Sequence, residues 1–446
     1  MDCGRRLLRL SNFVVHFNYM SLPAMPDSLR LEVEAYVKAN FDFTFKAENP
    51  SVRLHECSFG AEEINAALAT MLSTYVTMGK QTKHFEELCS KYFGFEHGIM
   101  VNSGSSANLL AVAALVNPVT PDRLYPGDEI IVPALSWSTT VWPLIQCGLV
   151  PVIIDVDPQT LNLDLDEVRK AIGSKTRGIM PVHVYGNPCD MDGLMEIAQK
   201  HKLIVIEDCC EALGALYRGK SVGSFGAVGT FSFYYSHHIT TLEGGICHTN
   251  DLHLAETMRI LRAHGWVRET QGRELYEAQY PEIDPRFLFV NVGFNLRPTE
   301  LQASFGPIQL KKLEQFIEIR ADNAAFWSQT MAPFGKYLHI QKPTLHGRHS
   351  WFGFPMVVRQ DAPFDPREFR EFLKKHHIEN RPLIAGNIAQ QPALKHFSHR
   401  VFGDLKEANL IMSNGLTFGN HQAVDEAARN YVLEIVTKFF REKQLI

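Results

Sequence analysis

Apolar and polar residues follow two different periods along the chain. From about residue 60, the segments AEEINAALATML and TKHFEELCSKYFG repeat apolar residues at helical spacing, and the second ends at Gly94. Short apolar runs follow, among them GIMVNS, DEIIVPA, VPVIIDVD, RGIMPVHV, KLIVIED and GTFSFYY, with helical segments between several of them. Such runs are typical of strands covered on both faces. Their order predicts a mostly parallel α/β sheet with right-handed crossovers, which binds ligands at the carboxyl ends of its strands.

The pattern changes in the C-terminal third of the chain. The amphipathic stretch TELQASFGPIQLKKLEQFIEIRADNAAFW predicts a pair of helices that leave the sheet domain. Beyond about residue 330, separated strands such as WFGFPMVV and helices such as DPREFREFLKKHH predict a smaller α+β domain. We therefore expect a large domain over residues 51–325, a small domain over 326–446, and an N-terminal extension over 1–50. For that extension we favour disorder or an upstream start codon over an organelle-targeting leader.

Composition narrows the classes of protein. Of the 446 residues, 44 are Lys or Arg and 49 are Asp or Glu, so the net charge is −5. This balance argues against a nucleic-acid binder held by bulk electrostatics. No run reaches the ~18 uninterrupted apolar residues of a membrane span. The eight cysteines form no CxxC pair, which favours reduced thiols in a cytoplasmic protein over a disulfide framework.

Three loops carry candidate chemistry. NSGSSANLLAVAAL, which includes Ser105 and Ser106, follows a strand and opens a helix, where free N–H groups suit a phosphate. Taken alone it fits an ordinary serine-rich helix cap better. Asp208 ends the strand KLIVIED and could hold a cationic ring nitrogen, although Asp is also a common cap at this place. In the third loop, Ser232 precedes the pair His237-His238, whose adjacent positions do not suit one metal ion. We predict no metal site.

In order along the chain, these segments resemble the DegT/DnrJ/EryC1/StrS family of sugar aminotransferases. The resemblance begins near Phe59 and runs to the C-terminus, and it includes NSGSSANLLA, PALSWSTT, HVYGNPCDMDGL, IEDCCEALGA, the loop 232–245 and GFNLRPTELQA. It implies the pyridoxal-phosphate (PLP) fold type I, which is aspartate-aminotransferase-like, with a mostly parallel sheet domain and a smaller C-terminal α+β domain. It also implies a homodimer in which the two subunits share each active site.

One departure from the family pattern concerns the lysine that binds the cofactor covalently. That lysine follows an SF pair, but here His237 occupies its position and no Lys occurs between residues 221 and 250. SHHIT…EGG and NRPLIAGNIAQQP resemble the 3-dehydratase branch, which removes the C3 hydroxyl from nucleotide-linked 4-keto-6-deoxyhexoses for 3,6-dideoxyhexose and lipopolysaccharide synthesis. Because no cysteine follows Cys247, the chain looks like the subgroup without an iron–sulfur cluster, which acts on GDP-4-keto-6-deoxymannose. Leu242 stands where that branch usually has Gly.

The resemblance also implies roles for individual residues. The cofactor would be PLP or its amine form, pyridoxamine phosphate (PMP), with glutamate as the amino donor. Cofactor contacts are expected from Ser105, Ser106, Trp137, Asp208, Glu211, Ser232 and, across the dimer interface, Asn295. Trp137 would stack on the ring and Glu211 would meet its 3-hydroxyl. His264 and Arg268 are candidates for substrate contacts, and a solvated helix end explains them equally well.

Histidine suits this position because imidazole forms no lasting covalent bond with PLP. With an ordinary pKa of about 6.5, roughly three-quarters of free histidine is neutral at pH 7, so His237 could accept a proton. Two alternatives stay open. The chain could be an aminotransferase that uses another lysine, of which Lys220 is the nearest in sequence, or a catalytically silent protein that binds cofactor or sugar nucleotide.

Overall fold

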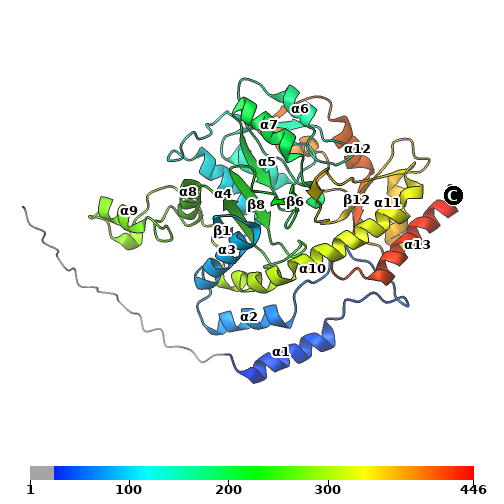
Figure 1. Ribbon diagram of the computed structural model, residues 1–446, viewed down its shortest axis with the longest axis horizontal. Helices are drawn as coiled ribbons and strands as arrows, with labels where there is room; N and C mark the ends of the chain where they lie inside the picture. The colour runs from blue at the N-terminus through cyan, green and yellow to red at the C-terminus, as the bar shows by residue number, and fades with distance from the viewer. Residues whose placement is uncertain (1–24) are drawn as a thin grey trace, which may run out of the picture.

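An eight-stranded sheet forms the centre of the computed structural model, which describes residues 25–446 (Figure 1). Its order is β1-β9-β8-β5-β4-β2-β3-β14. The strands are β1 (His97–Val101), β2 (Glu129–Pro133), β3 (Val150–Ile154), β4 (Thr176–Ile179), β5 (Ile204–Asp208), β8 (Val228–Ser232), β9 (Gly245–Thr249) and β14 (Arg400–Val401). All neighbouring pairs are parallel except those of β9, which is antiparallel to β1 and β8. The prediction of a mostly parallel sheet is confirmed.

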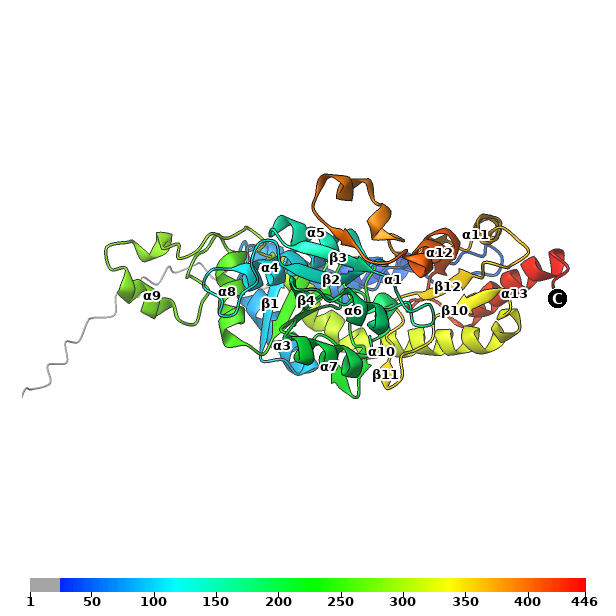
Figure 2. The same cartoon turned by 90° about the horizontal axis from the view of Figure 1, so that it is seen from above.

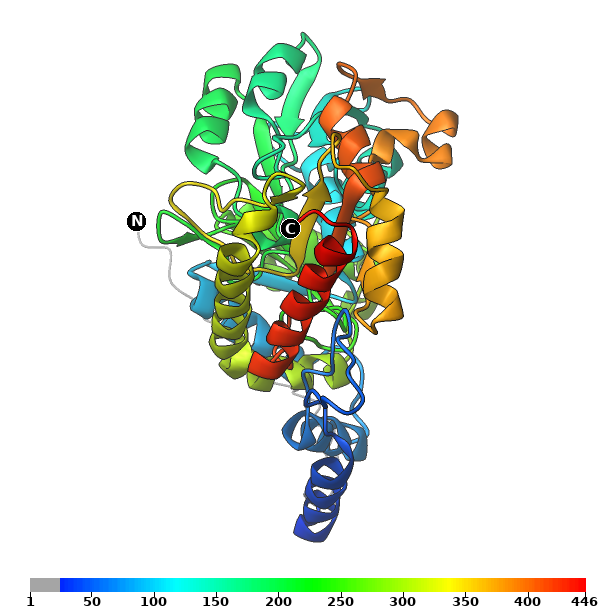
Figure 3. The same cartoon turned by 90° about the vertical axis from the view of Figure 1, so that its right-hand side faces the viewer.

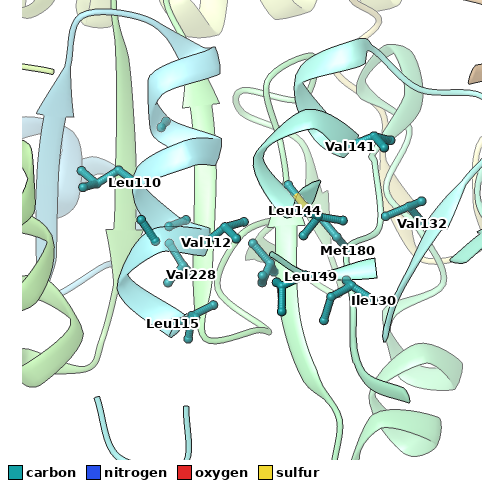
Figure 4. Close-up of a cluster of buried hydrophobic side chains, with 14 of the residues drawn as sticks. Leu110, Val112, Leu115, Ile130, Val132, Val141, Leu144, Leu149, Met180 and Val228 are labelled. Carbon is teal, nitrogen blue, oxygen red and sulfur yellow. The ribbon is translucent and has the colours of Figure 1, made fainter. Parts of the chain in front are cut away.

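Helices cover both faces of this sheet (Figure 2). They are α3 (Lys80–Phe93), α4 (Gly104–Val116), α5 (Ser138–Gln146), α6 (Leu165–Ala171), α7 (Met191–His201) and α8 (Leu252–Arg262), with the short α9 (Arg273–Gln279) at one end of the molecule. Successive residues of β2 point to opposite faces. Ile130 and Val132 join the cluster beneath α4 and α5 (Figure 4), whereas Ile131 joins the cluster beneath α6 and α7. Burial on both faces explains the continuous apolar run in the sequence.

The C-terminal part of the chain forms a second, antiparallel sheet. Its order is β10 (Leu338–Ile340), β12 (Phe354–Val358), β15 (Gly415–Phe418) and β13 (Asn380–Arg381), and α11 (Pro366–Lys375) and α13 (Glu426–Glu442) cover it. A small sheet of β11 (Gly347–Arg348), β6 (Leu216–Tyr217) and β7 (Lys220–Ser221) joins the two parts. Between β13 and α12 (Lys406–Asn414), the chain returns to the large domain, where β14 pairs with β3.

The predicted helix pair before the small domain is wrong, because residues 300–330 form one continuous helix, α10 (Glu300–Thr330). Pro307 lies inside it, and an interior proline costs about 3 kcal/mol. Apolar contacts on both domains offset this cost: Leu313 packs in the large domain, whereas Trp327 packs in the small one. Figure 3 shows α10 beside α13. The expected domain boundary at residue 325 therefore lies inside one continuous helix.

The N-terminal extension is ordered where the structure describes it. Helix α1 (Asp27–Asn40) packs against α2 (Ala61–Leu72), so the expectation of disorder over residues 1–50 is wrong for residues 27–40; residues 1–24 lie outside the described residues. Further along, Val52 pairs with Ile378 and belongs to the small-domain core. The segment between α1 and α2 therefore packs against the small domain, which the C-terminal part of the chain forms. Among residues 25–446, no helix combines the length and apolar character needed to cross a membrane.

Candidate active site

A cavity of about 500 Å³ opens at the carboxyl ends of the central strands. Residues of both domains line it: Ser103, Gly104, Ser105, Trp137, Thr139, Thr140, Val182, Asp208, Cys210, Glu211, Ser232, Tyr234, Ser236, His237, Glu243, Phe352, Arg381 and Ile384. The structure therefore brings together six of the residues singled out from the sequence: Ser105, Trp137, Asp208, Glu211, Ser232 and His237. No lysine is among the lining residues within the described part of the chain.

One end of the cavity is formed by the start of α4 and the end of β8. Ser103 caps α4, and its hydroxyl accepts the N–H of Ser106 at 3.1 Å. The N–H of Ser105 lies in the first helical turn, where backbone donors have no intrahelical partner. A Cβ atom on Gly104 would lie 2.5 Å from the Cβ of Ser232, so only glycine lets the helix and the serine approach this closely. The arrangement suits an anion, although a contact from the Ser106 N–H would replace its present bond to Ser103.

Gly245 is needed where β9 passes the start of α4. A Cβ atom there would lie 2.5 Å from the carbonyl oxygen of Ser103 and 2.7 Å from the nitrogen of Gly104, both of which are backbone atoms. Gly245→Ala is therefore expected to destabilise the protein by about 1–3 kcal/mol, measured by urea unfolding. Gly272→Ala is the control, because its added methyl group would meet its nearest atoms only at 4.0 Å. Equal stability of the two variants would contradict the tight passage.

A buried hydrogen-bond network holds Asp208 at the base of the cavity. Its Oδ2 accepts from Asn108 Nδ2 at 2.9 Å and from Thr140 Oγ1 at 2.8 Å, and its Oδ1 accepts the N–H of Cys210 at 3.1 Å. Asn108 is itself fixed, because its Oδ1 accepts from Thr230 at 2.5 Å. Sequence reasoning missed Asn108 and Thr140, although both lie in motifs quoted above. The network orients a carboxylate that a cationic ring nitrogen could pair with.

The ring of His237 is held in one tautomer. Its Nδ1 lies 2.7 Å from the carbonyl oxygen of Cys210, which can only accept, so Nδ1 carries the proton. Nε2 of the neutral ring is then the nitrogen with a free lone pair. Burial lowers the pKa of His237 to about 4, and the ring of Phe352 lies 4.9 Å away between centroids. At neutral pH, the side chain is therefore a base.

Glu211 is the second titratable group whose ionisation is shifted at this cavity. Its Oε2 accepts the N–H of Tyr185 at 2.9 Å. Burial raises the pKa of the Glu211 carboxyl to about 7, against the opposing effects of that N–H and of Arg381. Glu211 thus changes charge close to neutrality. Tyr185 provides its N–H from a left-handed backbone conformation, with φ of 55°.

Two further features bear on the sequence predictions. Leu242, where the dehydratase branch usually has Gly, has φ of 69°, the left-handed region that favours glycine, so the mismatch carries strain of about 1–2 kcal/mol.

Among residues 25–446, one group of potential metal ligands occurs: His183, Glu207 and Cys209. His183 Nδ1 accepts the N–H of Cys189 and its Nε2 lies 3.2 Å from Glu207, so hydrogen bonds occupy both ring nitrogens.

Three candidate residues lie away from the cavity of the single chain. His264 and Asn295 are close together, because Ala263 pairs with Asn295 and the N–H of His264 donates to Phe294. The Asn295 side chain accepts from Arg297 at 3.0 Å. Arg268 is exposed nearby. One chain alone leaves their predicted roles untested.

The residues present fit a flat phosphorylated ring with a basic nitrogen. Donors gather at the start of α4 and at Ser232, a buried carboxylate lies at the base, and Trp137 is 57% exposed beside the cavity, as an aromatic stacking platform requires. The sheet, its helices and the smaller domain form the fold of type I PLP-dependent enzymes. The chain belongs to the DegT/DnrJ/EryC1/StrS aminotransferase family, which residues 58–437 match.

Individual relatives and solved structures have more specific names than the family as a whole. The chain is 40% identical over 373 residues to GDP-4-keto-6-deoxy-D-mannose 3-dehydratase of Yersinia pseudotuberculosis, covering 83% of this chain and 94% of the relative. The Escherichia coli GDP-4-keto-6-deoxy-D-mannose-3-dehydratase with bound hydrated PLP superposes with a TM-score of 0.81 at 37% identity, covering 86% of this chain and 99% of the other. A GDP-4-keto-6-deoxymannose-3-dehydratase with a trapped PLP-glutamate geminal diamine gives 0.80 at 36% identity, with 86% and 100% covered.

Proposed function

We propose that the protein is a PLP- and PMP-dependent 3-dehydratase of a nucleotide-linked 4-keto-6-deoxyhexose, GDP-4-keto-6-deoxymannose, with glutamate as amino donor. The observation that carries the proposal is His237: a neutral imidazole with a free Nε2 lines the cavity where relatives of the family have a lysine. The names of the similar proteins agree with this substrate, cofactor and donor. The alternative aminotransferase lacks a lysine among the described lining residues.

Several of the residues that line the cavity have a defined task in this reaction. When bound, the cofactor supplies an amine that condenses with the sugar ketone and a ring that accepts electrons. Asp208 pairs with the protonated ring nitrogen, while the first turn of α4 and the Ser232 hydroxyl bind the phosphate. Trp137 stacks on the ring, and Glu211 meets its 3-hydroxyl. His237 Nε2 takes the proton from the cofactor's C4′ carbon and delivers it to the departing C3 hydroxyl.

The overall reaction balances in two half-reactions. In the first, glutamate and the aldehyde cofactor give 2-oxoglutarate and the amine cofactor. In the second, the amine cofactor and the sugar nucleotide give the 4-keto-3,6-dideoxy sugar, ammonia and the aldehyde cofactor. We expect purified protein incubated with PLP, glutamate and GDP-4-keto-6-deoxymannose to release ammonia and a 3-deoxy product, detected by mass spectrometry. A 4-amino sugar without ammonia would favour the aminotransferase, and absence of any product would favour the silent binding protein.

The pH profile of the second half-reaction should keep its acidic limb well below pH 6.5. Burial lowers the pKa of His237 to about 4, so the base form persists until the pH falls toward that value. Ammonia release by PMP-loaded enzyme between pH 4.5 and 8 measures the limb. Glu211→Gln is the control, because the pKa of Glu211 is raised to about 7. If the rate of the wild type changes near pH 7 and the rate of Glu211→Gln does not, that change belongs to Glu211. A limb at 6.5 that survives in Glu211→Gln would contradict the assignment.

We further propose that two copies of the chain complete each active site. Three exposed apolar side chains, Phe287, Phe289 and Val292, lie in the segment that leads to Asn295, and Val292 is 89% exposed. Apolar surface of this kind marks an interaction site. Asn295 of one chain would then reach the phosphate in the other, with His264 and Arg268 at the substrate. Sedimentation at twice the chain mass of 50.5 kDa is expected, and a monomer would overturn the shared site.

We also propose a cytoplasmic location for the enzyme. The seven cysteines between Cys57 and Cys247 are free thiols, as a reducing compartment requires.

A further inference from the structure

The loop that carries His237 contains a second histidine, His238, which is fully buried. Its Nε2 lies 2.9 Å from the carbonyl oxygen of Ser350 in the small domain. A carbonyl oxygen can only accept, so Nε2 carries the proton. Nδ1 has no hydrogen-bond partner among residues 25–446, so the bond to Ser350 is the one that the side chain makes there. Burial together with Arg320 lowers the pKa of His238 well below 6.5, and the ring is therefore a neutral donor that joins the loop to the small domain.

The segment that His238 binds, residues 350–352, leads into β12 and packs on the large domain. The N–H groups of Ser350 and Phe352 donate to two carbonyl oxygens of residues 185–186, at 2.9 and 2.8 Å. Trp351, between them, has φ of 50°, a left-handed conformation that is uncommon for a bulky residue and persists where the surroundings fix it. The conformation of the segment therefore depends on the groups that bind its backbone.

Phe352 brings this segment into contact with the base. Its ring lies 4.9 Å from the imidazole of His237 between centroids, with 34° between the two planes. The bond from Nδ1 to the carbonyl of Cys210 fixes one edge of the imidazole, and the phenyl ring packs on it from the small domain. These two contacts direct Nε2 toward the cavity and keep water from the rest of the ring.

We propose that His238 is a positioning residue for the base, because its bond to Ser350 holds Phe352 against the imidazole of His237. The inference rests on the proposed function, in which His237 takes and delivers the proton. It gives the two adjacent histidines different tasks through opposite tautomers, with the proton on Nδ1 in His237 and on Nε2 in His238. The first presents a lone pair to the cavity, and the second secures the wall that shields it.

The charged groups around His237 stay the same when His238 is replaced, since the ring of His238 is neutral. Burial lowers the pKa of His237 most, and Arg381 and Arg320 lower it further. The other titratable groups that line the cavity are Asp208, Cys210, Glu211, Tyr234 and Glu243. Because a substitution at residue 238 leaves all of them in place, a change in the pKa of His237 reports the access of water to its ring.

The test follows the titration of His237 in the full-length protein before cofactor is added. Diethyl pyrocarbonate modifies neutral imidazole, and mass spectrometry of peptides gives the rate at residue 237 against pH. In the wild type this rate should stay nearly constant down to about pH 5, because the pKa is about 4. In His238→Leu, which fills the space but cannot donate, the midpoint should rise by about one pH unit or more toward 6.5. His238→Gln, whose amide nitrogen can replace Nε2 as donor, should keep the wild-type midpoint.

His248→Leu is the matched control. His248 is equally buried, its Nδ1 lies 3.2 Å from the carbonyl oxygen of His97, and it does not line the cavity. Its replacement should lower the free energy of unfolding, as expected when a buried acceptor loses its donor, but it should leave the titration of His237 unchanged. A general loss of stability is thereby distinguished from a loss of positioning.

Phe352→Leu tests whether His238 acts through the phenyl ring. It should raise the midpoint by itself, and the double variant with His238→Leu should show no larger rise than Phe352→Leu alone. The acidic limb of ammonia release by PMP-loaded enzyme should move in the same direction in each variant.

Three results would overturn the proposal: a wild-type midpoint in folded His238→Leu, an equal rise in His238→Gln, or an unshifted midpoint in Phe352→Leu. The last of these decides the case if His238→Leu does not fold. Wild-type protein that shows the low midpoint at His237 but releases no ammonia would instead contradict the proposed function alone.

Discussion

His237→Asn is expected to lower the rate of the second half-reaction by about 10²–10⁴-fold, the usual contribution of a positioned acid–base group. Asparagine fills similar space and can donate to the Cys210 carbonyl that now accepts from Nδ1, but it has no basic nitrogen in place of Nε2. Single-turnover ammonia release from PMP-loaded enzyme measures the loss. The affinity for PMP should not change, because His237 is not among the residues proposed to hold the cofactor.

The control is His253→Asn, which replaces an exposed histidine on α8 whose Nε2 lies 2.9 Å from the carbonyl oxygen of Val119. It should keep wild-type rates. His237→Lys adds a second arm: it should lose dehydration and gain a covalent bond to PLP that borohydride makes permanent at residue 237. Covalent labelling of the wild type at any other lysine would return the aminotransferase alternative, and unchanged dehydration in His237→Asn would remove the residue from the mechanism.

Asp208→Asn is expected to weaken cofactor binding and to lower the rate by a comparable amount, about 10²–10⁴-fold. The variant keeps an oxygen for Asn108 and Thr140, which donate to Oδ2 at 2.9 and 2.8 Å, but it removes the charge that holds the ring nitrogen protonated. Losing one member of a buried charge pair costs about 3–5 kcal/mol. Fluorescence titration with PLP and absorbance of the bound cofactor across pH give the affinity and the ring-nitrogen pKa.

Asp251→Asn is the matched control for this variant. Asp251 caps α8 by accepting the N–H of Leu254 at 2.9 Å and is not among the residues that line the cavity. Its replacement should change the free energy of unfolding by at most about 1 kcal/mol and leave cofactor affinity intact. If Asp208→Asn bound PLP as tightly as Asp251→Asn, the carboxylate would not be the partner of the ring.

The sequence predicted the central sheet well because its signal is local. Burial on both faces leaves continuous apolar runs, and these runs became β2, β3 and β5 with helices between them. It failed at α10, where a Gly-Pro pair suggests an interruption that packing on two domains overrides. The extension was also misjudged, since α1 has no buried residue and leaves little trace in the hydrophobic pattern.

From the sequence, a residue of the site could be predicted only where it stands in a recognisable motif. His237, Asp208 and Ser232 stand in motifs that resemble a family, and all three line the cavity. Asn108 and Thr140 reach Asp208 from 100 and 68 residues away in the chain, a pairing that no spacing reveals. Arg381 comes from the small domain, and nothing local in the sequence indicates that the fold directs it to the cavity.

The acceptor that fixes the imidazole of His237 belongs to the polypeptide backbone and not to a side chain. Catalytic dyads built from two side chains can be broken by a single codon change at either position. Here, a substitution at residue 210 leaves the acceptor in place, since every amino acid has the same backbone carbonyl. Position 210 is thus free to drift among small residues during evolution while the base keeps its proton on the same nitrogen.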